Sequence, residues 1–402
     1  MTPPDSPAPI AGSPLQNSES TVTELTRALV SIPSVNPDLE EGGDAEGPLA
    51  RWIEVWLNAW DFDVSVTEPV AGRFNLVARL ATTEPGPRIV LNGHMDTVGV
   101  SGMEVDPFAA EVRDDRIFGR GSADMKGGLA AAMVAARELA RAGGPKRGEL
   151  ILAFTADEEY ASVGLKALLD GGFTADEAIV LEPTGLEIQP ANKGFTWLEL
   201  EVKGRAAHGS RPELGRDAIR DAGRILAALD RYELRLADQG PHPLLGRGSI
   251  HAGTIRGGTA PPVYPDRCDL ILEARILPDE SPQLAFQRFE GILAEIGRDR
   301  PLEVELRQGL SRPGAEIPSD HPLVRGLETA LSAEGITPRL SGMTAWVESA
   351  WFNEAGIPAL CFGPGSLDLA HTAVESVPIA ELESAVRALT RYLQTAFARE
   401  DR

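Results

Sequence analysis

Short, almost continuously apolar segments, each bounded by turn-forming residues, are the feature of this sequence that most constrains its fold. They are FNLVARL, RIVLNG, ELILAFTA, EAIVLEP and, much later, PALCFG. Runs of this kind are typical of strands that are buried on both faces of a sheet. Helical patterns alternate with them, notably at residues 125–141 and 163–169. The alternation predicts an α/β domain with a mostly parallel sheet and helices on both of its faces.

The pattern changes after Lys193, where TWLELEVKG alternates apolar and polar positions as a half-exposed strand does. The elements expected after this strand are an amphipathic helix at 215–239, strands near 249–255 and 267–276, a helix at 281–296 and a strand at 301–308. This β-α-β-β-α-β order is the ferredoxin-like arrangement. We therefore expect residues 194–308 to form an inserted α+β domain, and residues 21–193 and 309–402 to form the α/β domain.

The N-terminal segment and the cysteines suggest where the protein works. Residues 1–20 are rich in Pro and Ser, which predicts a disordered tail. They lack the features of a signal peptide, and no later run approaches the roughly 20 apolar residues of a membrane span. Cys268 and Cys361 both lie in apolar strand-like runs, so we expect buried thiols and a cytoplasmic protein.

Thr21 and Glu24 predict a capping box on the first helix.

The balance of charged residues argues against two classes of partner. The net charge of −22 repels the phosphate backbone of nucleic acids and the surface of anionic membranes. We therefore expect neither nucleic acid nor a membrane as a partner.

Five residues of metal-ligand type lie at the ends of predicted strands or in nearby loops. They are His94 in LNGHMDTV, Asp124 in GRGSADMKGG, Glu159 in FTADEEY, Glu182 in IVLEPT and His371 in LAHTAVES. Taken singly, each has an ordinary alternative, such as a solvated polar pair, a helix N-cap or an acidic turn. Ligands gather at the carboxyl ends of strands in open α/β sheets, so we expect the five to converge. Two imidazoles and three carboxylates suit a pair of divalent cations such as zinc.

Residues beside these ligands are candidates for other roles. Glu158 adjoins the ligand Glu159 and is free to work on a metal-bound water. Asp96 lies two residues after His94, so in extended chain it points the same way and is placed to accept the imidazole proton. His208 lies in a glycine-flanked loop, GRAAHGSRPELG, whereas the remaining histidines are expected to be structural or on the surface.

Taken together, the motifs resemble a known family of enzymes. HMDTV, GRGSADMKGG, the EE pair, EPT, AAHGSRPELG, GGTAPPVYPD with a later RILP, GIPALCFGPG and AHTAVE are similar to those of the di-zinc metallopeptidases that include acetylornithine deacetylase, succinyl-diaminopimelate desuccinylase, aminoacylase and carboxypeptidase G. The resemblance covers nearly the whole chain after residue 20. It implies that Asp124 bridges two metal ions, with His94 and Glu182 completing one site and Glu159 and His371 the other. The ions would be zinc, with cobalt or manganese as alternatives.

The resemblance also implies roles for residues that do not bind metal. Glu158 would be the general base, Asp96 would orient the first imidazole ligand, and the peptide bond after Asp124 would be cis. The inserted domain would be a lid that also forms the interface of a homodimer. His208 would reach into the active site of the partner subunit, and Arg275 would bind the substrate carboxylate.

Two departures from the family pattern concern the substrate rather than the metals. Pro262 stands where the family often has Asn, which affects an oxyanion or substrate contact, and Val347–Glu348 stands in place of Thr-Asp, which affects the floor of the substrate pocket. The expected reaction is hydrolysis of the amide bond of an N-acyl-L-amino acid. A metallo-dipeptidase or carboxypeptidase is the alternative enzyme, although Glu182 in place of Asp favours the acylase and carboxypeptidase side. A catalytically silent metal-binding scaffold is the third reading, and the intact ligands and Glu158 argue against it.

Overall fold

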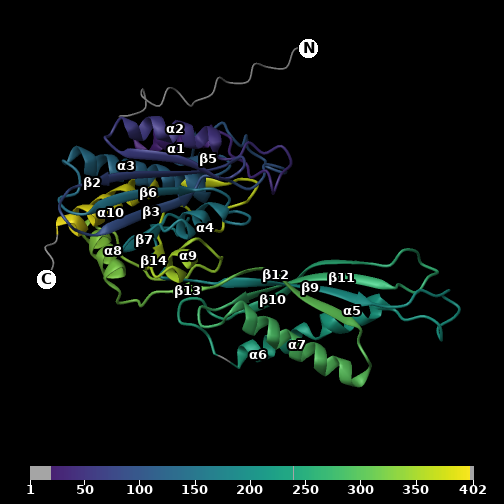
Figure 1. Cartoon of the computed structure of the whole chain (residues 1–402). Coiled ribbons are helices and arrows are strands. Elements are labelled where there is room, and N and C mark those ends of the chain that lie inside the picture. Colours follow the sequence, from purple (N-terminus) through teal and green to yellow (C-terminus); the bar gives the residue numbers. More distant parts are fainter. Residues whose placement is uncertain (1–19, 239, 399–402) are drawn as a thin grey trace, which may run out of the picture. The chain divides into compact units, whose positions relative to one another are not determined.

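The computed structural model describes residues 20–238 and 240–398, so nearly all of the predicted disordered tail lies outside the described residues. The chain forms two compact units (Figure 1). Among the described residues, the first comprises 20–190, Ile317–Ser341 and 347–398, and the second comprises Ala191–Glu316, apart from residue 239, and Gly342–Trp346. The second unit interrupts the first in sequence, and it extends beyond both ends of the predicted insertion at 194–308.

A six-stranded sheet forms the centre of the first unit, in the order β1-β2-β6-β3-β7-β14. Its strands are β1 (Asp63–Val70), β2 (Arg73–Ala81), β3 (Arg88–His94), β6 (Glu149–Thr155), β7 (Glu177–Val180) and β14 (Ala359–Cys361). Strands β6, β3, β7 and β14 are parallel to one another, which confirms the predicted α/β class. Strand β2, the FNLVARL run, differs because it is antiparallel to both β1 and β6. It follows β1 after a tight turn at residues 71–72, and strands joined so closely form an antiparallel hairpin.

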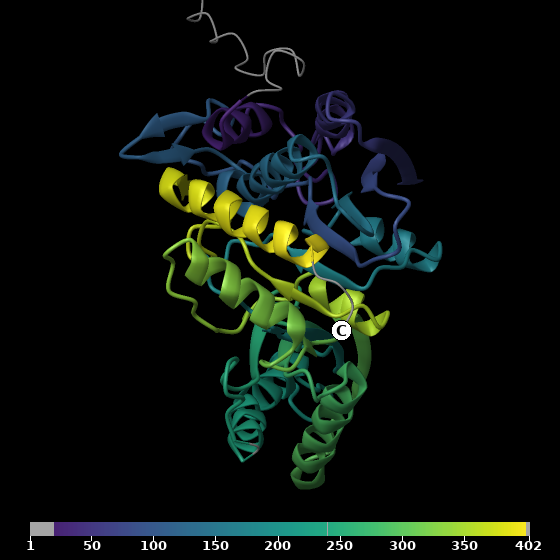
Figure 2. The ribbon, with the colours of Figure 1, turned by 90° about the vertical axis from the view of Figure 1, so that its left-hand side faces the viewer.

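Helices cover both faces of this sheet. They are α1 (Val22–Val30), α2 (Gly47–Asn58), α3 (Gly127–Arg141), α4 (Val163–Asp170), α8 (Pro322–Ala333), α9 (Ser349–Glu354) and α10 (Ile379–Ala398). In Figure 1, α1, α2 and α3 lie on one side of the sheet, and α4 and α9 lie on the other. Helix α10 packs against α3 and α8, and Figure 2 shows α10 and α8 side by side. Helix α3, which is rich in alanine, is buried along almost its whole length.

The first helix begins as the sequence predicts. The main-chain N of Thr21 donates to Oε2 of Glu24 at 2.8 Å, and the main-chain N of Glu24 donates to Oγ1 of Thr21 at 3.2 Å. These reciprocal bonds confirm the predicted capping box, which satisfies donors that the start of a helix leaves free.

Helix α3 begins two residues later than predicted, because an irregular turn, Ser122–Lys126, precedes it. Asp124 and Met125 have non-helical backbone angles, and the peptide bond between them is cis, as the family resemblance implies. The first turn of α3 lies very close to the end of β7. A Cβ atom on Gly128 would be 2.3 Å from the main-chain oxygen of Leu181, so glycine is required for this approach. The approach holds the turn that carries Asp124 against the end of the sheet.

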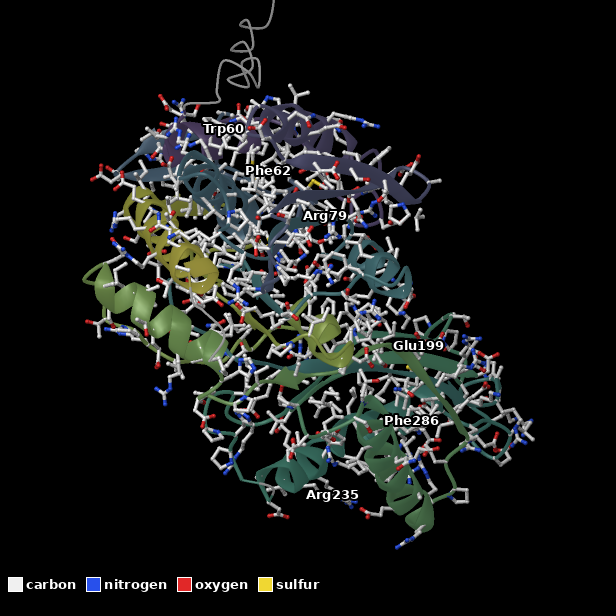
Figure 3. All side chains as sticks on the ribbon, turned by 60° about the vertical axis from the view of Figure 1, so that its left-hand side comes forward. Trp60, Phe62, Arg79, Glu199, Arg235 and Phe286 are labelled. Atoms are coloured by element: carbon white, nitrogen blue, oxygen red, sulfur yellow. The ribbon has the colours of Figure 1, made fainter. Side chains whose placement is uncertain are left out.

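The second unit contains a four-stranded antiparallel sheet in the order β10-β11-β9-β12. Its elements are β9 (Gly194–Lys203), α5 (Ala218–Ala227), α6 (Leu229–Ala237), β10 (Ser249–Gly257), β11 (Arg267–Ile276), α7 (Pro282–Asp299) and β12 (Val304–Arg312). The helices pack on one face of the sheet around an apolar core, to which Phe286 of α7 contributes (Figure 3). The single helix predicted at 215–239 is wrong in one respect, because it breaks at Ala228. Helix α5 packs against β11 and α6 packs against β10, so the chain changes course between two strands.

Shorter strands complete the two units. They are β4 (Glu111–Arg113), β5 (Arg116–Phe118) and β15 (Ser376–Pro378), which form a three-stranded sheet, and β8 (Ala191–Asn192) and β13 (Ala315–Glu316), which pair with each other. Cys268 and Cys361 are buried free thiols, as predicted. Within the described part of the chain, no helix is both long and apolar enough to cross a membrane.

Candidate metal centre

Three parallel strands of the first unit end at the same edge of the sheet. Strand β3 ends at His94, β6 is followed closely by Glu158 and Glu159, and β7 is followed by Glu182. His94 is the Cα partner of Thr155 in the ladder between β3 and β6, so these two strands end level with each other. The predicted ligands of these three strands therefore share the edge where ligands bind in open α/β sheets.

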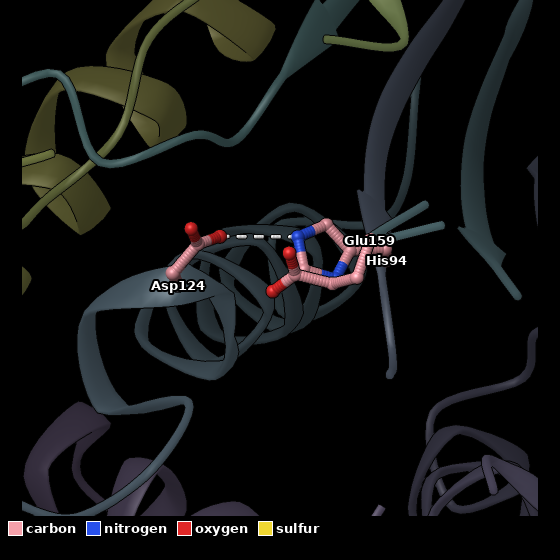
Figure 4. A group of neighbouring side chains, drawn as sticks. All are labelled: His94, Asp124 and Glu159. Carbon is pink, nitrogen blue, oxygen red and sulfur yellow. Dashed lines mark hydrogen bonds and ion pairs between the residues drawn. The ribbon is translucent and has the colours of Figure 1, made fainter. Parts of the chain in front are cut away.

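His94, Asp124 and Glu159 form a compact group of potential metal ligands (Figure 4). One ligand atom from each of the three lies within 4.8 Å of the other two. The dashed line in Figure 4 joins Nε2 of His94 and Oδ1 of Asp124, which are 3.1 Å apart. His94 and Asp124 are buried, so both are shielded from solvent. An imidazole and two carboxylates at this spacing can bind one divalent cation.

His371 joins this group from the loop before β15. Its Nε2 lies 3.0 Å from Oε2 of Glu159 and 3.3 Å from Oδ2 of Asp124. Asp124 therefore presents one carboxylate oxygen to His94 and the other to His371. Burial alone would lower the pKa of His371, but its hydrogen bonds to Asp124 and Glu159 raise it to about 11. The same two imidazoles hold the pKa of Asp124 below its usual value, although burial opposes them.

Glu182 is a buried carboxylate whose environment suits a cation. Within the described residues, its Oε1 has no hydrogen-bond partner. Burial, followed by the charge of Asp124, raises the pKa of Glu182 well above its ordinary value. A buried carboxylate is costly unless a charge or hydrogen-bond donor compensates it. The donor set of the centre, with this unsatisfied oxygen, therefore fits divalent cations.

Asp96 lies beside His94, and two of its oxygens face the imidazole, the main-chain oxygen more closely than the carboxylate. Nδ1 of His94 is 2.9 Å from the main-chain oxygen of Asp96 and 3.6 Å from the carboxylate oxygen Oδ1. Strand β3 ends at His94, and the main-chain oxygen of Asp96, just beyond the strand, makes the closer contact with the imidazole. The Asp96 carboxylate also accepts the main-chain N–H groups of Glu158 at 3.1 Å and Glu159 at 3.3 Å. Asp96 therefore fixes the main chain that carries both glutamates.

Glu158 lies among charged groups of the centre. Burial is the main reason why its pKa is raised well above the ordinary value, and the charge of Glu182 adds to the shift. His94 acts in the opposite direction. A carboxyl group with a raised pKa is better matched to proton transfer near neutral pH than an exposed glutamate.

Glu375 holds the turn that carries Asp124, a role that no motif in the sequence indicates. Its Oε1 accepts the main-chain N–H groups of Ala123 at 3.0 Å and Asp124 at 3.1 Å. Its Oε2 lies 2.5 Å from Nη1 of Arg120, so the buried carboxylate is paired with a guanidinium. Glu375 stands within LAHTAVES, four residues after His371, but only the pairing of β15 with β5 brings it to Arg120.

Glu348, part of the second departure from the family pattern, is a buried carboxylate close to the centre. It accepts hydrogen bonds from Oγ1 of Thr155 at 2.6 Å, Oγ of Ser162 at 2.8 Å and Nδ2 of Asn92 at 3.2 Å. Its charge contributes to the raised pKa of Glu158, after burial and the charge of Glu182. Glu348 therefore acts on the centre through electrostatics and through the strand ends that it holds.

The remaining predicted residues belong to the second unit. His208 is exposed, and its Nδ1 lies 2.8 Å from Oγ of Ser210. The loop of Pro262 lies against the loop of His208, because the main-chain N of Gly209 donates to the oxygen of Pro262 at 2.8 Å. The first departure from the family pattern is thus a direct neighbour of His208.

Arg275 lies on β11 and already has partners within the second unit. Its Nε donates to Oε1 of Glu273 at 2.7 Å, and its guanidinium lies 5.5 Å from the ring centre of Phe195. Burial and the nearby charge of Arg275 lower the pKa of Lys193. Two positive side chains are therefore neighbours at this end of the sheet.

Known proteins are similar to most of this chain in sequence. The model of Peptidase family M20/M25/M40 matches residues 90–395. An acetylornithine deacetylase from Myxococcus xanthus is 33% identical over 355 residues, which cover 86% of this chain and 90% of that protein. N-formyl-4-amino-5-aminomethyl-2-methylpyrimidine deformylase from Halalkalibacterium halodurans is 29% identical over 402 residues and covers 92% of each chain.

Solved structures share the fold. A tripeptidase from Staphylococcus aureus has a TM-score of 0.80 at 22% identity, with 95% of this chain and 99% of that chain covered. A Bacillus subtilis protein described as a dinuclear metal binding peptidase from M20 family has a TM-score of 0.72 at 16% identity, with 95% and 99% covered. The comparisons confirm the predicted family resemblance and the α/β fold class.

Proposed function

The chain belongs to Peptidase family M20/M25/M40 and is a hydrolase of that family, and we propose that it cleaves the amide bond of N-acyl-L-amino acids. The observation that carries this proposal is the convergence of His94, Asp124 and Glu159 within 4.8 Å, with Glu158 beside them. The acyl class of substrate is supported by relatives named as a deacetylase and a deformylase.

We propose that the centre holds two divalent cations, zinc or alternatively cobalt or manganese. Asp124 would bridge them, because its two oxygens face different imidazoles. His94 and Glu182 would complete one site, and Glu159 and His371 would complete the other. Bound cations of this kind polarise the substrate carbonyl and make water easier to deprotonate.

Glu158 is the proposed general base. It would take a proton from the attacking water and return it to the leaving amine. The hydrogen bond from its main-chain N to Asp96 fixes the start of its side chain, and the neighbouring carboxylates favour its protonated form after the first transfer. Both features suit a group that must gain and then lose one proton.

We propose that the second unit is a lid that also forms the interface of a homodimer. His208 is exposed on a loop, where it is free to reach the active site of a second copy and donate to the developing oxyanion. Arg275 would bind the substrate carboxylate, with Glu273 orienting its guanidinium. The cytoplasmic location stays a prediction from the sequence.

A dipeptidase or carboxypeptidase activity of the same centre is the second candidate. It is favoured by the likeness in fold to a tripeptidase, and a peptide bond is also an amide. The two candidates differ in the group on the carbonyl side of the scissile bond, which is an acyl group in one and an amino acid in the other.

A substrate panel separates the two candidates. The metal-loaded protein is incubated with acetyl, succinyl and formyl L-amino acids and with dipeptides, and the released amine is measured. We expect release from at least one acyl series at a kcat/KM well above that for every dipeptide. Release from dipeptides alone would favour the second candidate, and release from neither class would contradict both.

A further inference from the structure

The loop that follows β6 carries Glu158 and Glu159, and it has an unusual main chain. Asp157, the residue before them, has a φ of 65°, which lies in the left-handed region. Residues other than glycine rarely occupy this region, because their Cβ atom crowds the main chain. The conformation needs support from the residues around it.

The Asp157 side chain provides part of that support. Its Oδ1 accepts hydrogen bonds from Nη1 of Arg73 at 2.9 Å and from Nδ2 of Asn36 at 3.0 Å. Its Oδ2 accepts the main-chain N–H of Ala161 at 3.2 Å, which closes the loop on its other side. Asp157 is therefore bound both to its own loop and to two side chains from distant segments.

Asn36 connects this loop to Asp96. Its Nδ2 donates to Oδ2 of Asp96 at 2.8 Å as well as to Asp157, and its Oδ1 accepts from Nη1 of Arg73 at 3.2 Å. Asn36 is completely buried, so water does not replace these bonds. The Asp96 carboxylate also accepts the main-chain N–H groups of Glu158 and Glu159. The side-chain amide of Asn36 is therefore linked to both glutamates through the carboxylate of Asp96.

Arg73 anchors the arrangement to strand β2. Its Nε donates to the fully buried Glu46 at 3.1 Å, and its Nη2 lies 3.8 Å from Oδ2 of Asp96. The Arg73 guanidinium thus lies close to the carboxylates of Glu46, Asp96 and Asp157. Its planar set of N–H groups restrains the orientation of these carboxylates. Asn36, Glu46, Arg73, Asp96 and Asp157 together form a buried polar network behind the metal centre, and we call it the Asn36 network.

We propose that Asn36 and Arg73 are positioning residues, which hold the main chain of residues 157–159 so that Glu158 and Glu159 face the centre. The inference rests on the proposed roles of Glu158 and Glu159. Neither Asn36 nor Arg73 touches the group of ligands, and each acts through Asp96 and Asp157. Loss of a supporting hydrogen bond of this kind commonly costs about 10- to 100-fold in metal affinity or activity.

The test compares two variants of the network with two controls. Asn36→Ala removes both donated hydrogen bonds, and Arg73→Lys keeps the charge but loses the fork. Arg79→Lys alters the other arginine of β2 (Figure 3), which is paired with Glu149 at 2.9 Å outside the network. Val386→Ala, on α10, is a control for loss of stability alone.

Each protein is stripped of metal, checked for folding by circular dichroism and thermal unfolding, and titrated with Zn²⁺ against a chelating dye. We expect Asn36→Ala and Arg73→Lys to bind Zn²⁺ about 10- to 100-fold more weakly than the wild type, with kcat reduced and KM little changed. The controls should keep wild-type affinity whatever their thermal midpoint. Wild-type affinity and kcat in folded Asn36→Ala protein would overturn the inference, even if Arg73→Lys did not fold.

The proposed function and the positioning role of Asn36 and Arg73 can be contradicted independently of each other. If the wild type released no amine from any substrate while Asn36→Ala still lost Zn²⁺ affinity, the proposed function would be wrong and the positioning role would stand. If the wild type was active and Asn36→Ala matched it in affinity and kcat, the positioning role would be wrong and the function would stand.

Discussion

Nε2 of His371 lies 3.0 Å from Oε2 of Glu159, although 212 residues separate them in the sequence. The second unit accounts for much of this separation, because it occupies Ala191–Glu316 between the two residues. His371 therefore reaches the centre only because the first unit resumes after the insertion.

Replacing the proposed base should separate catalysis from metal binding. We predict that Glu158→Ala retains its metal but loses about 10²- to 10⁴-fold in kcat, because proton transfer by a positioned group contributes about this much. Metal content by mass spectrometry and kcat on the best acyl substrate are the measurements. Glu383→Ala, an exposed glutamate of α10, is the matched control and should resemble the wild type. Near-full turnover in Glu158→Ala would show that another group is the base.

Removing the metal should destabilise the first unit. Without cations, the carboxylates of Asp124, Glu159 and Glu182, which are almost fully shielded from solvent, lack the compensation that two bound charges provide. We predict that added Zn²⁺ raises the thermal midpoint, with a stabilisation of about 2.7 kcal/mol at a free concentration of 100 times Kd. His371→Ala should reduce this shift. A midpoint that does not respond to Zn²⁺ would argue against a cation site in the folded protein.

Glu348 should influence the pH dependence of the reaction. Burial is the largest cause of the raised pKa of Glu158, and the negative charge of Glu348 adds to it. Glu348→Gln removes that charge, so the pKa of Glu158 falls and the base stays deprotonated to lower pH. We predict that the acidic limb of the kcat/KM profile moves to lower pH. A shift to higher pH, or none in a folded variant, would contradict this electrostatic role.

Asp221 should stabilise the second unit in a pH-dependent way. Burial would raise its pKa, but hydrogen bonds from Arg300, Arg224 and Arg216 lower it below the ordinary value of 3.8. The stabilisation is therefore complete above pH 3.8 and is lost as the pH falls through the lower pKa of the folded protein. We predict that Asp221→Asn lowers the free energy of unfolding by about 2 kcal/mol at pH 7.

Denaturant unfolding of Asp221→Asn and wild type between pH 7 and pH 3 is the measurement. The difference in the free energy of unfolding between wild type and Asp221→Asn should become smaller as the pH approaches 3. The exposed Asp230→Asn on α6 is the control, and a difference that stayed constant across the range would refute the assigned cause.

His208 gives a test of the proposed dimer. We predict that His208→Ala lowers kcat without loss of metal, since removing one oxyanion donor costs about 3–4 kcal/mol in transition-state stabilisation. Mixed with inactive Glu158→Ala, it should recover part of the activity, because a mixed dimer contains one complete site. Absence of recovery under conditions where subunits exchange would rule out a shared site.

The sequence was sufficient to predict the parts of the centre that lie on strand ends. His94, Glu159 and Glu182 follow apolar runs that become adjacent parallel strands, so local patterns identified their positions. The capping box at Thr21 was equally local. The antiparallel direction of β2 was not predictable, because burial on both faces, which the run FNLVARL indicates, does not determine the direction of a strand.

The residues that hold the proposed metal ligands in place could not be predicted in the same way. Asn36 and Arg73 carry no motif, and their importance depends on contacts with Asp96 and Asp157 across the fold. The relative distances of the two Asp96 oxygens from His94, 2.9 Å for the main-chain oxygen and 3.6 Å for the carboxylate oxygen, likewise depend on where β3 ends. Contacts such as those of Asn36 and Arg73 form between segments that are far apart in the sequence, and the spacing of residues along the chain does not show which segments meet.

Stepwise addition of Zn²⁺ to the metal-free protein, with amine release followed at each step, tests the two-cation hydrolytic centre most directly. We predict that activity on an acyl-L-amino acid rises until two equivalents of Zn²⁺ are bound per chain, and that Asp124→Ala binds fewer ions and stays inactive. Full activity of the metal-free wild type, or full activity of Asp124→Ala, would contradict the centre formed by His94, Asp124, Glu159, Glu182 and His371.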